Sequence, residues 1–145
     1  YVCSASVNLL GDAPVEAPGY TPDEIDGAFG KPDFTGLFYP GVTFEKEPSL
    51  YTMFVPPAKR TEAEWQEVYK KYSLVENLHE KEVPEFLAYG TLDPLTGCKE
   101  YQNALIEKGI PHKTVVLKGY THGFVITKRW PSLLSEFVRW ADDNA

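Results

Sequence analysis

The sequence has 145 residues, of which 43% are hydrophobic and 24% are charged, and its net charge is −7. This length and balance indicate one soluble globular domain and exclude both disorder and a second domain of ordinary size. An acidic chain without a basic stripe argues against nucleic acid as a partner and against anionic membrane surfaces, and its short apolar runs do not span a bilayer. Cys3 and Cys98 are too few for a disulfide scaffold.

The first residues predict the end of a strand followed by a helical turn. Val2 and Cys3 are apolar, and residues 7–10 (VNLL) fit a first turn of helix. The N-terminus shows no positively charged leader with an apolar core. Because a natural chain rarely begins inside a strand, we expect truncation, processing or a missing companion chain. The compartment stays open, with the cytoplasm favoured.

Three short apolar runs predict buried strands. They are residues 34–39 (FTGLFY), 85–90 (EFLAYG) and 113–118 (KTVVLK). Their near-continuous apolar character favours a sheet that is covered on both faces. The Pro/Gly/Asp-rich residues 11–33 predict a surface loop, and residues 45–60 predict an insertion near the mouth of a site.

Three helices are predicted between and after these strands. The first begins at Thr61, which has capping-box spacing to Glu64. The second begins at Pro94 and ends at Gly109, and the third opens at Pro131. Their apolar stripes are Trp65, Val68 and Tyr72; Leu95, Cys98, Tyr101 and Leu105; and Leu133, Leu134, Phe137, Val138 and Ala141. The alternation predicts an α/β fold, a parallel sheet with flanking helices, in a single domain over 1–145.

Two polar residues follow neighbouring strands at the points where those strands end. Asp93 lies in residues 90–94 (GTLDP) and His122 lies in residues 119–124 (GYTHGF). Because the carboxyl ends of parallel strands meet at one edge, about 4.8 Å apart, we expect the two side chains to form a hydrogen bond. Such a pair fixes the imidazole tautomer and stabilises its protonated form during acyl transfer. Taken singly, Asp93 reads as a helix cap and His122 as a loop residue; the pairing favours catalysis.

Ser4 is the candidate nucleophile. It lies between an apparent strand end and a helical turn, and the order Ser…Asp…His is that of a nucleophile elbow and its partners. The small Ser6 suits the crowded elbow, whereas Val2 does not. The alternative is a serine-rich terminus without chemistry. The neighbouring Cys3 is more simply a small buried hydrophobe than a thiol nucleophile.

Four segments resemble the C-terminal half of α/β-hydrolase-fold esterases of the acetyl-xylan-esterase and hormone-sensitive-lipase-like kind. They are residues 31–40 (KPDFTGLFYP), 83–94 (VPEFLAYGTLDP), 109–111 (GIP) and 119–124 (GYTHGF). The resemblance implies Ser4 as nucleophile, Asp93 as the acid and His122 as the general base. It also implies the N–H of Ala5 as one oxyanion donor. The family's Gly-x-Ser-x-Gly is VCSAS here, at residues 2–6, and the family's N-terminal half with its His-Gly-Gly-type loop is absent from this sequence.

The sequence therefore predicts a serine esterase that cleaves short acyl or carbohydrate esters through an acyl-enzyme, without a metal or an organic cofactor. His79 and His112 have no second ligand at metal spacing. The alternative, which the missing glycines support, is a catalytically impaired relative that serves as a binding or interaction module. In either case we expect a companion N-terminal chain or a second copy to cover the exposed strand edge.

Overall fold

The computed structural model describes residues 19–21, 23–24, 32–42, 59–78, 83–94 and 97–145. The predicted loop at 11–33 and the predicted insertion at 45–60 therefore lie largely outside the described residues. None of the helices in the described part of the chain is long and apolar enough to cross a membrane.

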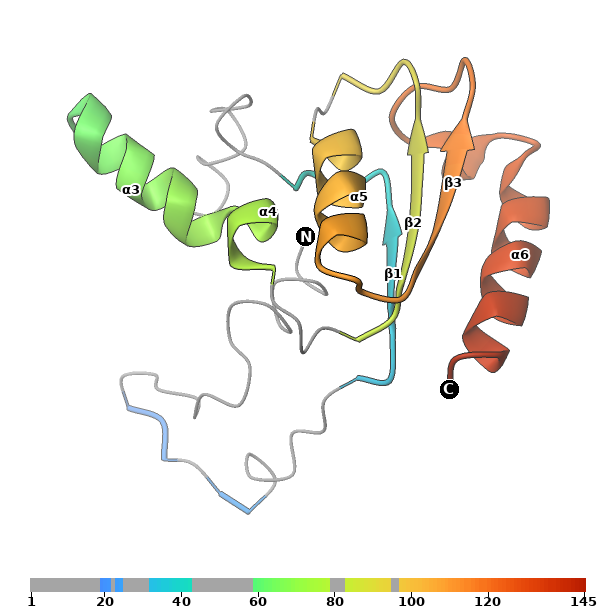
Figure 1. The fold of residues 1–145 in the computed structure, drawn as a ribbon, viewed down its shortest axis with the longest axis horizontal. Coiled ribbons are helices and arrows are strands. Elements are labelled where there is room, and N and C mark those ends of the chain that lie inside the picture. Colours follow the sequence, from blue (N-terminus) through green and yellow to red (C-terminus); the bar gives the residue numbers. More distant parts are fainter. Residues whose placement is uncertain (1–18, 22, 25–31, 43–58, 79–82, 95–96) are drawn as a thin grey trace.

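Strands and helices alternate along the described chain, as predicted (Figure 1). In chain order the elements are β1 (Thr35–Phe38), α3 (Glu62–Tyr72), α4 (Leu74–Asn77), β2 (Glu85–Gly90), α5 (Cys98–Glu107), β3 (His112–Leu117), the 3₁₀ helix η3 (Phe124–Ile126) and α6 (Trp130–Asp142). The three strands predicted at 34–39, 85–90 and 113–118 are present, with their bounds shifted by a residue at most. The strand end and helical turn predicted at residues 1–10 lie outside the described residues.

The three strands form one parallel sheet in the order β1-β2-β3. Leu37 of β1 is opposite Leu87 of β2, which in turn is opposite Thr114 of β3. Since the strands are parallel, all three carboxyl ends lie at one edge of the sheet. That edge is where an open α/β sheet binds its ligands.

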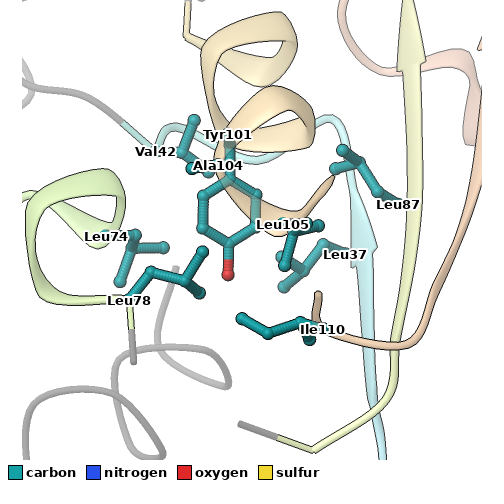
Figure 2. Close-up of a cluster of buried hydrophobic side chains, with 9 residues drawn as sticks. All are labelled: Leu37, Val42, Leu74, Leu78, Leu87, Tyr101, Ala104, Leu105 and Ile110. Carbon is teal, nitrogen blue, oxygen red and sulfur yellow. The ribbon is translucent and has the colours of Figure 1, made fainter. Parts of the chain in front are cut away.

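Alternate residues of β2 contribute to two hydrophobic clusters, one on each face of the sheet. Leu87 packs with α4 and α5 in the first cluster, where the Tyr101 ring lies among the aliphatic side chains (Figure 2). Phe86 and Ala88 pack with α6 and η3 in the second. The full first cluster is Leu37, Val42, Leu74, Leu78, Leu87, Tyr101, Ala104, Leu105 and Ile110. The expectation of a sheet covered on both faces is confirmed.

Helix α3 begins as its sequence predicts. The Thr61 backbone N–H donates to Glu64 Oε2 at 2.6 Å, and the Glu64 N–H donates to Thr61 Oγ1 at 3.3 Å, which completes the capping box. No residue of α3 is buried, however. Its Trp65 ring instead stacks on Tyr69 and lies 5.0 Å from the Arg60 guanidinium.

The prediction that the second helix begins at Pro94 is wrong. Helix α5 begins at Cys98, directly after Gly97, whose φ of 104° is left-handed. Residues 90–93 form a turn instead, closed by a hydrogen bond of 3.3 Å from the Asp93 N–H to the Gly90 carbonyl. Its end is as predicted, with Gly109 in the left-handed region.

Helix α6 presents a narrower apolar face to the sheet than its sequence suggests. Leu133 is fully buried, and Phe137 and Trp140 pack against the second cluster, following the helical repeat. Leu134 and Val138, which were expected on the same face, are 39% and 47% exposed. The sheet therefore covers only one strip of α6.

A charged residue is buried at the amino end of β2, away from the edge where ligands bind. Glu85 has no exposed surface, and the Tyr101 hydroxyl donates to its Oε1 at 2.8 Å. Its Oε2 and the hydroxyl of the neighbouring Thr35 have no hydrogen-bond partner in the described structure. Burial raises the pKa of Glu85 to about 7, against the lowering effect of the hydrogen bond from Tyr101.

Candidate active site

The candidate site lies where the loops after β2 and β3 run beside each other, at the carboxyl edge of the sheet (Figure 1). Residues 91–94 follow β2 and residues 118–123 follow β3. These loops carry Asp93 and His122, one on each.

Backbone hydrogen bonds tie the two loops together. The Thr91 N–H donates to the Leu117 carbonyl at 3.0 Å, and the Leu92 N–H donates to the Tyr120 carbonyl at 2.9 Å. The Thr91 hydroxyl also accepts from the Gly119 N–H at 2.9 Å. These three bonds fix the separation of the loops, so the positions of Asp93 and His122 follow from the pairing of β2 with β3.

A glycine at the end of β2 permits this close approach. A Cβ atom on Gly90 would lie 2.1 Å from the Tyr120 carbonyl oxygen and 2.7 Å from its carbon. Both are backbone atoms, which cannot turn aside as a side chain can. The residue before the loop must therefore lack a side chain.

Asp93 and His122 are in contact. Nδ1 of His122 lies 3.2 Å from Oδ1 and 3.1 Å from Oδ2 of Asp93. The Asp93 side chain is only 3% exposed, whereas that of His122 is 42% exposed. The Asp93 carboxylate is therefore shielded from solvent, whereas part of the His122 imidazole is accessible.

This geometry determines what the imidazole can do. Because a carboxylate accepts at Nδ1, the ring proton belongs on Nδ1, and Nε2 carries the lone pair. The carboxylate also stabilises the imidazolium once Nε2 takes up a second proton. The alternative interpretation of Asp93 as a helix cap is wrong, because α5 begins at Cys98.

The other candidate residues divide into those the structure describes and those it does not. Ser4 and Ala5 lie outside the described residues, as do Cys3 and His79. The nucleophile and the oxyanion donor therefore stay predictions from the sequence, whereas Asp93 and His122 are both described.

Cys98 is a structural thiol and not a nucleophile. It is 4% exposed, and its Sγ–H donates to the Pro40 carbonyl at 3.3 Å. Burial, and after it the negative charges of Asp93 and Glu100, raise the pKa of the thiol to about 12. The sequence prediction of a core cysteine is confirmed.

The described residues hold no group of three or more His, Cys, Asp or Glu side chains that could bind a metal ion. Within that part of the chain, Nδ1 of His112 lies 2.8 Å from the Ile110 carbonyl oxygen. This contact gives His112 a local structural role at the start of β3.

Sequence reasoning missed one residue that touches the pair. The Tyr39 ring lies 4.6 Å from the His122 ring, centroid to centroid. In the sequence Tyr39 reads only as the last residue of a predicted strand, before Pro40 and Gly41. No pattern in the sequence indicates its backbone conformation or the direction of its ring.

Comparisons with known proteins identify the fold. No family model and no curated protein matches the sequence. Among solved structures, dipeptidyl peptidase 4 of Porphyromonas gingivalis is similar with a TM-score of 0.64 at 18% identity, over 78% of this chain and 16% of that chain. Native esterase 2 of Thermogutta terrifontis is similar with a TM-score of 0.57 at 20% identity, over 94% of this chain and 50% of that chain. The same esterase phosphoramylated by tabun gives 0.58 at 19% identity, over 94% of this chain and 49% of that chain.

These similarities confirm the predicted fold class. Three parallel strands with flanking helices match the α/β-hydrolase fold of these esterase and peptidase structures. The chain spans about half the length of the esterase and a smaller part of the peptidase.

Proposed function

We propose that this chain carries the triad of a serine hydrolase that cleaves carboxylic esters. The contact between Nδ1 of His122 and the Asp93 carboxylate, at 3.1–3.2 Å, is the observation that carries the proposal. Ser4 is the nucleophile in this proposal, and the N–H of Ala5 is one oxyanion donor.

The proposed reaction proceeds in two steps. Nε2 of His122 takes the proton of the Ser4 hydroxyl as Oγ attacks the ester carbonyl, and a C–O bond to serine forms. The imidazolium, held by Asp93, returns this proton to the departing alcohol as the ester C–O bond breaks. Water then attacks the acyl-enzyme with the same residues in the same roles, which releases the carboxylic acid and restores Ser4.

Exposure and burial suit these roles. His122 must reach both the serine hydroxyl and the leaving group, and its side chain is accessible. Asp93 only has to stabilise the imidazolium, and its carboxylate is shielded from solvent, which strengthens the interaction with a charged ring. An accessible histidine paired with a shielded aspartate is the combination that a proton relay needs.

Short acyl esters are the substrates that we propose, with carbohydrate esters as a second group to be tried. Esterase 2 of T. terrifontis, which has the same fold over this chain, has been solved with butyrate bound and phosphoramylated by tabun. Its ligands motivate the choice of butyrate esters and phosphorus reagents as probes.

A binding or interaction module remains the second candidate. Val2 and Ser6 occupy the positions where the esterase motif has glycine, and a strained elbow favours glycine there. This candidate keeps the Asp93–His122 contact as a structural feature and predicts that no ester is turned over.

A phosphonate ester probe tests the proposed nucleophile. We expect a p-nitrophenyl phosphonate to modify Ser4 covalently, as detected by peptide mass spectrometry, and to modify neither the Ser4→Ala variant nor the His122→Ala variant. Ser6→Ala is the matched control and should be labelled like the parent. Absence of label on Ser4 in a preparation with native circular dichroism would remove the nucleophile assignment and favour the binding module.

A further inference from the structure

Tyr39 has an unusual backbone conformation at the end of β1. Its φ is 43°, and it is the only residue other than glycine with a positive φ in the described part of the chain. For a bulky aromatic residue this region is a true outlier, because the Cβ atom crowds the backbone. Such a conformation persists only where surrounding contacts enforce it, and it is frequent at functional sites.

Contacts on both sides enforce this conformation. The Tyr39 N–H donates to the Ala88 carbonyl of β2 at a short 2.7 Å. The next residue, Pro40, is buried, and its carbonyl accepts from the Cys98 thiol of α5 at 3.3 Å. The chain therefore leaves β1 along a path fixed by β2 and α5, and this path determines where the Tyr39 side chain can lie.

The ring of Tyr39 lies against the loop that carries His122. Its centroid is 4.6 Å from the His122 ring at an interplanar angle of 70°, and 5.0 Å from the Phe124 ring at 90°. Both are edge-to-face geometries, which aromatic rings prefer. Phe124 is only 1% exposed, so it provides a fixed surface behind Tyr39.

His122 needs a restraint of this kind. The imidazole is bonded to its Cβ atom and is held at Nδ1 by the contact with Asp93. Its side chain is 42% exposed, so packing supports the ring only in part. The Tyr39 ring adds a packing contact with the imidazole to the polar contact with Asp93.

We propose that Tyr39 is a positioning residue for His122: its ring fixes the plane of the imidazole, so that Nδ1 stays on Asp93 while Nε2 points toward the reacting atoms. The strained backbone of Tyr39 directs its ring onto the histidine. The effect on turnover rests on the proposed esterase function, whereas the restraint of the ring does not.

Variants at position 39 distinguish the effect of the tyrosine ring from the effect of its left-handed backbone. Tyr39→Gly and Tyr39→Asn both accept a left-handed backbone, so they remove the ring without adding strain. Tyr39→Phe keeps the ring and removes only the hydroxyl. Thermal melting of each variant shows whether it has folded. Two ring-deletion variants are made so that the test can proceed if one of them does not fold.

Nitrogen-15 NMR of the histidine side chains in the intact protein is the direct measurement. In the parent and in Tyr39→Phe we expect a single His122 signal set with the proton on Nδ1 and with ring-current shifts from residue 39. In the folded Gly and Asn variants we expect exchange broadening or mixed tautomers at His122, with His112 unchanged as an internal control. An unaltered His122 spectrum in a folded ring-deletion variant would overturn the proposal.

Ester turnover supplies a second readout. The ring-deletion variants should lose kcat by about 10- to 100-fold with little change in KM, since misplacing a catalytic group by an ångström has this effect. Tyr39→Phe should restore the parent rate. If the parent itself turns over no ester while its NMR spectrum shows the restraint, the esterase proposal fails and the positioning of His122 by Tyr39 stands. Equal kcat values in the folded Gly and Asn variants and the parent would contradict the catalytic part of the proposal.

Discussion

At the scale of single residues, removing the charge of Asp93 is the simplest test of the proposed proton relay. Its replacement by asparagine keeps the shape of the side chain and removes the charge that fixes the Nδ1–H tautomer. We expect Asp93→Asn to lower kcat for a p-nitrophenyl ester by about 10³- to 10⁴-fold, by analogy with triads of this type. The exposed Asp142 of α6 provides a control, because Asp142→Asn should leave the rate unchanged. Parent-like turnover in Asp93→Asn would exclude a proton relay.

Glu85, which is not part of the candidate active site, makes the stability of the fold depend on pH. Its pKa in the folded protein is about 7, against an ordinary value of 4.5, because burial disfavours the charged carboxylate. The folded state therefore holds this proton more tightly than the unfolded state does. The resulting stabilisation is complete below pH 4.5 and is lost as the pH rises through 7.

We expect this loss to amount to roughly 3 kcal/mol in the free energy of unfolding, since each pKa unit corresponds to about 1.4 kcal/mol. Glu85→Gln should flatten the profile in urea denaturation and raise stability above neutral pH, because the amide can still accept from Tyr101 and can donate toward Thr35. A variant whose stability falls with pH as steeply as that of the parent would show that another group is responsible.

At the scale of elements, the register of β2 against β3 positions the site. Gly90 is opposite Leu117 in the sheet, and both loops leave from this pair. A side chain at position 90 would meet the Tyr120 backbone at 2.1 Å and push the loops apart. The Asp93–His122 contact depends on that spacing.

We therefore expect Gly90→Ala to reduce ester turnover by about 10²-fold, as an ångström-scale displacement of a catalytic group does. Gly36→Ala is the matched control: its Cβ would lie 2.8 Å from the Phe137 ring, in the second hydrophobic cluster and away from the two loops. It should destabilise the fold, measured by thermal melting, without reducing kcat in the folded fraction. Equal effects of both substitutions on kcat would argue that Gly90 acts only through stability.

The elements were predictable where a local rule sufficed. Strand composition and the Thr61 capping box depend on neighbouring residues, and both predictions are confirmed. The start of α5 was not predictable, because residues 91–93 make contacts with residues 117–122, which are distant in the sequence. The exposed side of α6 likewise depends on how wide a surface the sheet offers, which the periodicity of the helix does not contain.

The site likewise contains one feature that could be predicted from the sequence and one that could not. The contact between Asp93 and His122 was predictable because adjacent parallel strands deliver their loops to one edge. The ring of Tyr39 was not, since its direction depends on a left-handed backbone that no sequence rule assigns to tyrosine.

At the scale of the whole molecule, the arrangement of the sheet motivates the proposal of a partner. Within the described residues β1 and β3 are edge strands, and Val116 of β3 is 47% exposed. Exposed strand edges pair readily with another chain. We expect light scattering after size exclusion to give a mass above the 16.3 kDa of this chain, from a companion chain or a second copy. A monodisperse species of 16.3 kDa would contradict this expectation.

The rate of ester hydrolysis in two histidine variants is the most direct test of the proposed catalytic pair. His122 contacts Asp93 at the carboxyl edge of the sheet, whereas His112 contacts a backbone carbonyl at the amino edge. We expect His122→Ala to abolish the turnover of p-nitrophenyl butyrate and a folded His112→Ala variant to retain it. Turnover that survives in His122→Ala, or that is absent from the parent, would contradict the assignment of this pair to catalysis.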